Sequence, residues 1–319
     1  MIIRPTAAGS SPAAFFALKE KLTMSIYETV TARILAQLDA GVVPWRKTWT
    51  SGLPKSLTTG KEYRGVNILI LGTTPFSSRY WVTYREAQRL GGHVRRGERA
   101  SPVVFWKWRT PEELARLREK TGREDPTPCV PFTAAVFNIE QVEGVDRPED
   151  DVPNRPNDRL EVAEQLLEVM PDLPEIVHVA TRDPSYSPRL DRVTLPHLSQ
   201  FESGAEYYAT LFHELVHATG ATKRLNRFDQ VEGDRFERYS FEELVAEFGA
   251  AFLCSFAGIE SPETEALQAS YIQGWAEALR RDQRLVVRAA SAAQRAADYI
   301  RGTVITNSLD ETASPAEGG

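Results

Sequence analysis

The run His213-Glu214-Leu215-Val216-His217 has the spacing HExxH. On an α-helix, residues four apart lie on the same face, so both imidazoles can point toward one cation. The glutamate beside the first histidine can then act as general base for the water that such a cation activates. The spacing therefore predicts a zinc hydrolase site, with His213 and His217 as Zn²⁺ ligands and Glu214 as the catalytic base.

Three fixed letters also occur by chance, and the alternative is an ordinary amphipathic helix with two histidines and a surface glutamate. The flanking sequence favours a helix, because apolar side chains surround the motif and Gly220 can end it. The apolar neighbours are Tyr207, Tyr208, Leu211, Phe212, Leu215 and Val216. The site prediction then depends on finding a third ligand.

A hydrolytic zinc site takes three protein ligands and leaves the fourth position for water. In an HExxHxxGxxH site the third ligand would fall on Lys223, so that class is excluded. Glu243 and Glu247 share one helical face further along, where a carboxylate is costly to bury unless it is paired or bound to metal. We expect Glu243 to be the ligand and Glu247 to accept a hydrogen bond from a ligand histidine. The reverse assignment stays open, as do Asp229 and Asp234.

Hydrophobic periodicity predicts the elements that position these residues. The expected helices cover residues 25–41, 65–71, 83–90, 159–170, 240–257 and 271–300, besides the HExxH helix. The expected strands cover residues 80–82, 103–108, 132–139, 176–180 and 192–196, and residues 111–128 read as a poorly patterned insert. The fold class is α+β, a small basic α+β N-terminal domain followed by a mostly helical domain.

The 319 residues suffice for two domains, each with its own core. We expect domains at residues 24–147 and 159–305, joined by a proline-rich linker at 148–158. Residues 1–23 and 306–319 are expected to be a disordered extension and tail, with Met24 as a candidate start of translation.

The net charge of −6 conceals a contrast between the two halves. Residues 24–109 carry 14 basic and 5 acidic side chains, a net +9, whereas residues 148–319 carry 16 and 30, a net −14. A basic half joined to an acidic half indicates that the two meet different partners.

Five of the six tryptophans also lie in residues 24–109, interleaved with basic residues. Positive charge follows a phosphate backbone, and exposed rings stack unpaired bases at about 1–3 kcal/mol per base. We therefore predict binding of single-stranded DNA. The predicted contact residues are Trp45, Lys47, Arg64, Trp81, Arg95, Lys107 and Trp108. The alternative is that the rings fill a core, which we expect of about half of them, but a core does not explain the charge.

The composition, 42% hydrophobic and 26% charged, is typical of a globular protein. No apolar run approaches the length that crosses a membrane, so we expect no membrane partner. The two cysteines, Cys129 and Cys254, form no CxxC pattern, and we expect a reducing, cytoplasmic location.

With these residues in view, the chain resembles the ArdC-like antirestriction proteins of plasmids and other mobile elements. The resemblance extends from Met24 to about Arg301. It rests on Pro44-Trp45, Tyr63-Arg64-Gly65-Val66-Asn67, Arg96-Gly97-Glu98, Val136-Phe137-Asn138-Ile139-Glu140-Gln141, Tyr186-Ser187-Pro188, Leu195-Pro196, Tyr207-Tyr208, residues 213–220, Arg224-Leu225, residues 242–247 and Tyr271-Ile272-Gln273-Gly274-Trp275.

The resemblance implies a single-stranded-DNA-binding domain fused to a zincin-like metallopeptidase domain, in a protein that protects incoming DNA from host restriction. The second half is also similar to gluzincins, whose ExxxD/E pattern falls on Glu243 and Glu247.

The expected function is that of an antirestriction protein with a zinc peptidase site, acting on a host restriction protein or another DNA-bound protein. The oxyanion of peptide hydrolysis needs a hydrogen-bond donor, for which Tyr186 is our candidate. One rival is a non-catalytic protein that coats DNA and holds a structural zinc. A second rival is a DNA-dependent protease that cleaves many DNA-bound proteins.

Overall fold

The computed structural model describes residues 27–46, 52–122, 126, 128–148, 156–179, 184–231, 233–259 and 269–303. Residues 1–23, residues 306–319 and Lys47 lie outside this part of the chain, so the predictions made for them remain predictions. The fold is α+β, as predicted. No helix of the described residues is long and apolar enough to cross a membrane.

The N-terminal half is built on a four-stranded mixed sheet in the order β1-β2-β5-β4. β1 runs parallel to β2, and the other two pairs are antiparallel. Its strands are β1 (Lys55–Ser56), β2 (Tyr80–Thr83), β4 (Ser101–Trp108) and β5 (Cys129–Asn138). The other elements of this half are a helix over residues 27–39, η1 (Pro44–Arg46), α2 (Val66–Gly72), α3 (Tyr84–Arg89), β3 (His93–Val94), η2 (Ile139–Gln141) and β6 (Val142–Glu143).

α2 is fixed to β4 through a buried asparagine. The side-chain amide of Asn67 donates to the Val104 carbonyl at 2.8 Å, and its oxygen accepts from the Val104 amide at 2.7 Å. α2 begins after Gly65, which has a φ of +55° that L residues rarely adopt. Within the run Tyr63 to Asn67, Gly65 is therefore favoured by the backbone conformation, and Asn67 by its two hydrogen bonds to Val104.

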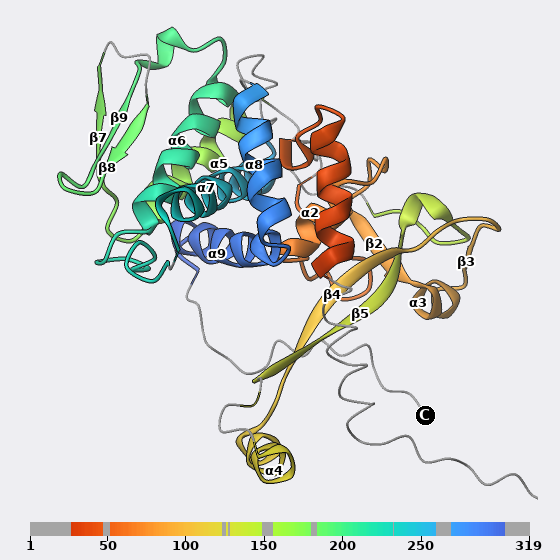
Figure 1. Cartoon of the computed structure of the whole chain (residues 1–319). Helices are drawn as coiled ribbons and strands as arrows, with labels where there is room; N and C mark the ends of the chain where they lie inside the picture. Colours follow the sequence, from red (N-terminus) through yellow and green to blue (C-terminus); the bar gives the residue numbers. More distant parts are fainter. Residues whose placement is uncertain are drawn as a thin grey trace, which may run out of the picture.

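β4 and β5 form a long hairpin that projects from the body of the molecule, with α4 (Pro111–Thr121) at its far end (Figure 1). The sequence predicted a poorly patterned insert here, and that prediction is wrong. α4 has a capping box between Thr110 and Glu113 and proline at its first position, both favourable for starting a helix. Because α4 buries no residue, it lacks the apolar stripe on which the prediction relied.

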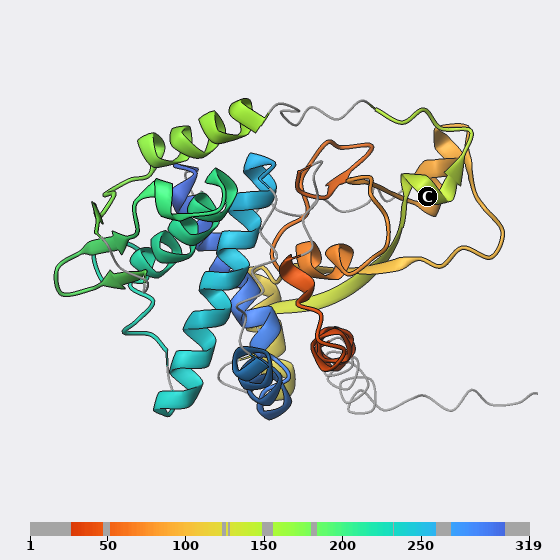
Figure 2. The ribbon, with the colours of Figure 1, turned by 90° about the horizontal axis from the view of Figure 1, so that it is seen from above.

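The C-terminal half combines helices with a small sheet in the order β7-β9-β8. Its elements are α5 (Pro156–Val169), β7 (Glu175–His178), β8 (Ser185–Ser187), β9 (Arg192–Leu195), η3 (Leu198–Gln200), α6 (Gly204–Thr219), α7 (Arg235–Ala257), α8 (Ala269–Arg281) and α9 (Leu285–Ile300). Figures 1 and 2 place this sheet and the four-stranded sheet at opposite ends of the molecule, with helices between them.

Several element boundaries differ from the predictions, and two of the differences change how the chain is divided. α5 begins at Pro156, inside the predicted linker 148–158, because proline is tolerated in the first turn of a helix. The predicted helix over residues 271–300 is two helices, α8 and α9. The Asp282 carboxylate accepts from the Arg284 amide at 2.8 Å, a local bond that offers the backbone an alternative to the helix.

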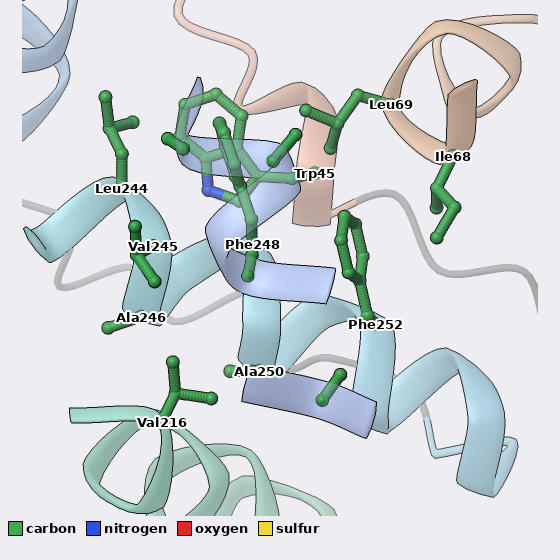
Figure 3. Close-up of a cluster of buried hydrophobic side chains, with 14 of the residues drawn as sticks. Trp45, Ile68, Leu69, Val216, Leu244, Val245, Ala246, Phe248, Ala250 and Phe252 are labelled. Carbon is green, nitrogen blue, oxygen red and sulfur yellow. The ribbon is translucent and has the colours of Figure 1, made fainter. Parts of the chain in front are cut away.

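One hydrophobic cluster extends through both halves, where the sequence predicted a separate core for each, and a second, smaller cluster belongs to the N-terminal half alone. Trp45 and Leu69 of the N-terminal half belong to the same cluster as Phe248 and Phe252 of α7 (Figure 3). The Trp45 ring lies edge-on to Phe248, with ring centroids 4.9 Å apart, and equally close to Trp275 of α8, at 5.1 Å. The boundary that composition suggests therefore does not separate two independent cores.

Candidate functional site

α6 carries the HExxH run, and its start is encoded locally. The Ser203 hydroxyl caps the helix by accepting from the Glu206 amide at 3.1 Å. Leu211, Leu215 and Val216 are fully buried on one side of the helix. The histidine side chains share another face, where His213 and His217 are 21% and 15% exposed. The helix is thus held by its apolar face while both imidazoles remain accessible.

α7 supplies the carboxylates, and a glycine sets its distance from α6. A Cβ atom on Gly249 would lie 2.7 Å from Cγ2 of Val216, closer than such atoms approach. The absence of that side chain lets the two helix backbones approach closely at Val216, the residue before His217, and Figure 3 shows Val216 of α6 facing α7. Glu243, six residues before Gly249 on the same helix, is thereby held against the histidines.

Three potential ligand atoms converge between α6 and α7. Nε2 of His213 and Nε2 of His217 lie 3.1 Å apart. The Glu243 carboxylate oxygens lie 3.9 Å from Nε2 of His213 and 3.7 Å from Nε2 of His217. All three atoms fall within 4.8 Å of one another. The structure therefore brings together the two histidines and the glutamate that sequence reasoning preferred.

The other ring nitrogens face different carboxylates. Nδ1 of His217 lies 3.1 Å from Oε1 of Glu242, whereas Nδ1 of His213 lies 3.7 Å from Oε1 of Glu247, too far for a hydrogen bond. The prediction that Glu247 is the hydrogen-bond acceptor therefore needs correction, since Glu242 has that role toward His217. Glu242 points away from Glu243 on the helix, as expected, and this direction brings its carboxylate to Nδ1 of His217.

Sequence reasoning also missed the partner of Glu242. Arg227 donates from Nε to Oε2 of Glu242 at 2.8 Å and from Nη2 to Oε1 at 2.6 Å. It also donates to the Val216 carbonyl at 2.9 Å, which ties it to α6. The pKa of the Glu242 carboxyl is low because the hydrogen bonds from Arg227 and His217 outweigh the opposing effect of its burial. No spacing rule links Arg227 to a residue fifteen positions later.

Glu214 is buried beside the cluster, at 7% exposure. This burial raises the pKa of its carboxyl, and the Glu243 charge raises it further, while His217 and the backbone amide of Tyr186 oppose the shift. A carboxylate with a raised pKa is a stronger proton acceptor than one in water. Such a pKa is what a general base at this position requires.

The candidate oxyanion donor is placed differently from the prediction. The Tyr186 hydroxyl donates to Oδ1 of Asp191 at 2.9 Å, and Asp191 also pairs with Arg224 at 2.7 Å. The Tyr186 backbone amide, rather than the phenol, is the group that bonds to Glu214. β8 therefore meets the site through its main chain, while the phenol is held by Asp191.

Two of the predicted DNA contacts are wrong. Trp81 is fully buried and Trp45 is 4% exposed, so neither ring is available to stack on a base. Both fill the core, the alternative that the sequence left open. Arg95 pairs with Glu98 at 2.7 Å in an exposed turn, and Lys107 is exposed on β4.

The remaining predicted contacts, Arg64 and Trp108, line a cavity of about 1370 Å³. It lies between the N-terminal half and α9, so its walls come from both halves of the chain. Trp106, Trp108, Arg85 and Arg89 contribute from the N-terminal half. The α9 side contributes Val287, Ser291, Gln294, Arg295 and Asp298.

An HExxH helix packed against a helix that bears a glutamate is the arrangement of a zincin-like metalloprotein. Residues 164–292 match the family MPTase-PolyVal, described as a zincin-like metallopeptidase. Residues 24–137 match the family ArdcN, the N-terminal domain of the anti-restriction factor ArdC. The two families together cover the two halves of the chain.

Two solved structures resemble the chain over most of its length. The metal-free crystal structure of the antirestriction ArdC protein from the R388 plasmid superposes with a TM-score of 0.68 at 34% identity, covering 87% of this chain and 97% of that one. The Mn(II)-bound structure gives the same TM-score at 32% identity, covering 88% and 98%. This chain belongs to the ArdC antirestriction family.

Three relatives match most of the chain in sequence. Uncharacterized protein y4eC of Sinorhizobium fredii is 36% identical over 86% of this chain and 91% of its own length. Two proteins named DNA primase TraC, both from Escherichia coli, are 33% and 35% identical over 92% and 86% of this chain. The chain spans only 29% and 20% of those primases.

Proposed function

We propose that this chain is an antirestriction protein that binds single-stranded DNA and hydrolyses peptide bonds at a divalent metal ion held by His213, His217 and Glu243. The observation that carries the proposal is the convergence of three ligand atoms within 4.8 Å beside a buried glutamate. The peptidase substrate would be a protein bound to DNA or belonging to the host restriction system.

The donor set fits a divalent ion. Two imidazole nitrogens and one carboxylate oxygen are ligands that zinc takes in catalytic sites, at bond lengths near 2.0–2.2 Å. Ligand atoms at that distance in a tetrahedron lie about 3.3 Å apart. The two Nε2 atoms are 3.1 Å apart, and one atom from each of the three residues lies within 4.8 Å of the others, so small side-chain shifts would bring all three onto one ion. The zincin-like family implies a divalent metal, and one of the related R388 ArdC structures is Mn(II)-bound. We propose zinc, with manganese as the alternative.

The same distances favour Glu243 over Glu247 as third ligand. Glu243 approaches Nε2 of both histidines, whereas Glu247 faces Nδ1 of His213. Glu247 also accepts from the Trp45 indole at 3.2 Å, which engages its carboxylate outside the cluster. Its negative charge, 3.7 Å from Nδ1 of His213, is proposed to favour the ring orientation that turns Nε2 toward the ion, without a direct hydrogen bond.

A bound divalent ion would polarise a substrate carbonyl and acidify a water molecule. Glu214 accepts a proton from the attacking water and returns it to the leaving amine, for which its raised pKa suits it. The Tyr186 backbone amide orients the Glu214 carboxylate, so the base has a fixed direction. The Tyr186 hydroxyl donates to Asp191, so it is not proposed as the oxyanion donor.

Single-stranded DNA is proposed as the partner of the N-terminal half. The support is an exposed ring, Trp108 at 52%, beside basic side chains in a cavity of about 1370 Å³. Small-molecule pockets are usually about 300–1,000 Å³, so the volume favours a polymer segment. Bases are available for stacking only when they are unpaired.

The substitution Glu214→Gln tests the peptidase. It removes the base while leaving the three metal ligands, so the variant should keep its metal and lose antirestriction activity in a transfer assay with a restricting host. If protection persists unchanged with full metal content, the chain protects DNA by coating it, and the site has a structural role. Cleavage of many unrelated DNA-bound proteins would instead favour a general DNA-dependent protease.

A further inference from the structure

We propose that a single DNA strand lies in the cavity between the N-terminal half and α9, so that the zincin-like half forms one wall of the DNA site. This inference rests on the proposed binding of single-stranded DNA and adds the contribution of α9. Its central residue is Arg295, an exposed cation of α9 that lines the cavity.

The two walls are joined by specific contacts. The Gly65 amide donates to Oε1 of Gln294 at 2.9 Å, and Arg64 forms an ion pair with the buried Asp298. At the end of α9, Arg301 lies 3.5 Å from Glu62. Because these contacts fix α9 against the segment that precedes α2, the cavity is formed before any ligand arrives.

The charge of the lining favours a polyanion. Its three acidic groups are engaged: Asp298 by Arg64, Glu62 by Arg301, and Glu86 by Thr58 and Thr83 hydroxyls. Against these three carboxylates the lining carries six cations, and the charge of Arg89 also acts on Glu86; the six are Lys61, Arg64, Arg85, Arg89, Arg295 and Arg301. The lining thus presents a surplus of positive charge that a phosphate backbone would neutralise.

The rings of the lining favour an unpaired strand. Trp108 is 52% exposed and Trp106 is half-buried, and both belong to β4, in the part of the lining that the N-terminal half supplies. Flat rings on one wall and cations on both can bind bases and phosphates at the same time. An acidic peptide would use the cations and leave the rings without a function, so DNA is the ligand that uses the whole lining.

The test is binding of a fluorescein-labelled oligothymidylate to the full chain, followed by anisotropy at several salt concentrations. Arg295→Gln should weaken binding several-fold at low salt and reduce the slope of log Kd against log salt by about 0.7, as expected for one lost phosphate contact on a single strand. Arg288→Gln is the matched control, because Arg288 lies on the same helix, is exposed, and pairs with Asp282 outside the lining. It should bind as the wild type does.

Trp108→Ala separates this inference from the proposed function. If the wild type binds no single strand, the proposed DNA function fails. If Trp108→Ala weakens binding while Arg295→Gln changes neither the affinity nor the salt slope, the N-terminal half binds DNA alone. The proposal that α9 contributes to the DNA site would then be wrong. Equal competition by duplex and single strand would also overturn the proposal, since a duplex offers no unpaired bases.

Discussion

The indole Nε1 of Trp45 donates to Oε2 of Glu247 across 3.2 Å, although the two residues are 202 positions apart. The other oxygen of Glu247 lies 3.7 Å from Nδ1 of His213. A tryptophan of the N-terminal half therefore contacts the carboxylate beside a candidate metal ligand. The two halves meet at the metal site as well as in the core.

Trp45→Phe should weaken metal binding, by up to about tenfold, because Glu247 loses the donor that fixes its position. Zinc affinity measured by competition with a chromophoric chelator gives the value directly. The same substitution in a Glu247→Ala background is the control for the lost ring volume. There, Trp45→Phe should cause little further loss of zinc affinity. Equal losses in both backgrounds would mean that Trp45 acts through packing alone.

Gly249→Ala should destabilise the protein by about 1–3 kcal/mol, because the added methyl group overlaps Val216. Combining it with Val216→Ala creates room, so the double variant should be less destabilised than the sum of the single variants. Urea unfolding followed by circular dichroism measures each change in the free energy of unfolding. Strict additivity would contradict the close approach of α6 and α7.

Glu242→Ala should reduce zinc affinity by about 10- to 100-fold, since His217 loses the acceptor at its Nδ1. Glu242→Gln keeps an acceptor and should recover part of that affinity. Glu277→Ala is the control, because Glu277 is an exposed residue of α8 paired only with Arg281 among the described residues. A Glu242→Ala variant with wild-type affinity would exclude the proposed orientation of His217.

Asp191 should make stability depend on pH in the acid range. Hydrogen bonds, first from Arg224 and then from Lys223 and Tyr186, hold the pKa of its carboxyl well below the usual range, although partial burial opposes this. A carboxyl with a lowered folded-state pKa stabilises the fold above its unfolded pKa, about 3.9, and this contribution is lost as the pH falls through the folded value.

The stability difference between wild type and Asp191→Asn should therefore be largest near neutral pH and shrink below about pH 4. Thermal unfolding at a series of pH values measures that difference. A difference that stays constant from neutral pH to pH 2 would show that Asp191 does not titrate with a lowered pKa.

The sequence predicted those features that one helix or strand encodes by itself. The HExxH spacing, the apolar stripe of α7 and the strand pattern of β4 led to elements near their observed positions. α4 was not predicted because none of its residues is buried, so no apolar stripe marks it. Composition likewise marked the N-terminal half as basic and aromatic.

Features that depend on tertiary contact could not be predicted in this way. Trp45 and Trp81 share type and neighbourhood with Trp108, yet only Trp108 is exposed, because packing decides which rings are buried. Glu242 and Arg227 meet only once the loop after α6 folds back onto α7. The wall that α9 adds to the cavity also follows from packing, since no local pattern links residue 64 to residue 298.

Metal analysis of the purified full-length protein and two variants tests the central claim most directly. After saturation and removal of excess zinc, the wild type and Glu247→Ala should each hold about one ion per chain, and Glu243→Ala should hold almost none. Full zinc occupancy in Glu243→Ala, with loss of zinc in Glu247→Ala, would show that Glu247 rather than Glu243 is the third ligand. A wild type that binds no divalent ion would contradict the metallopeptidase account altogether.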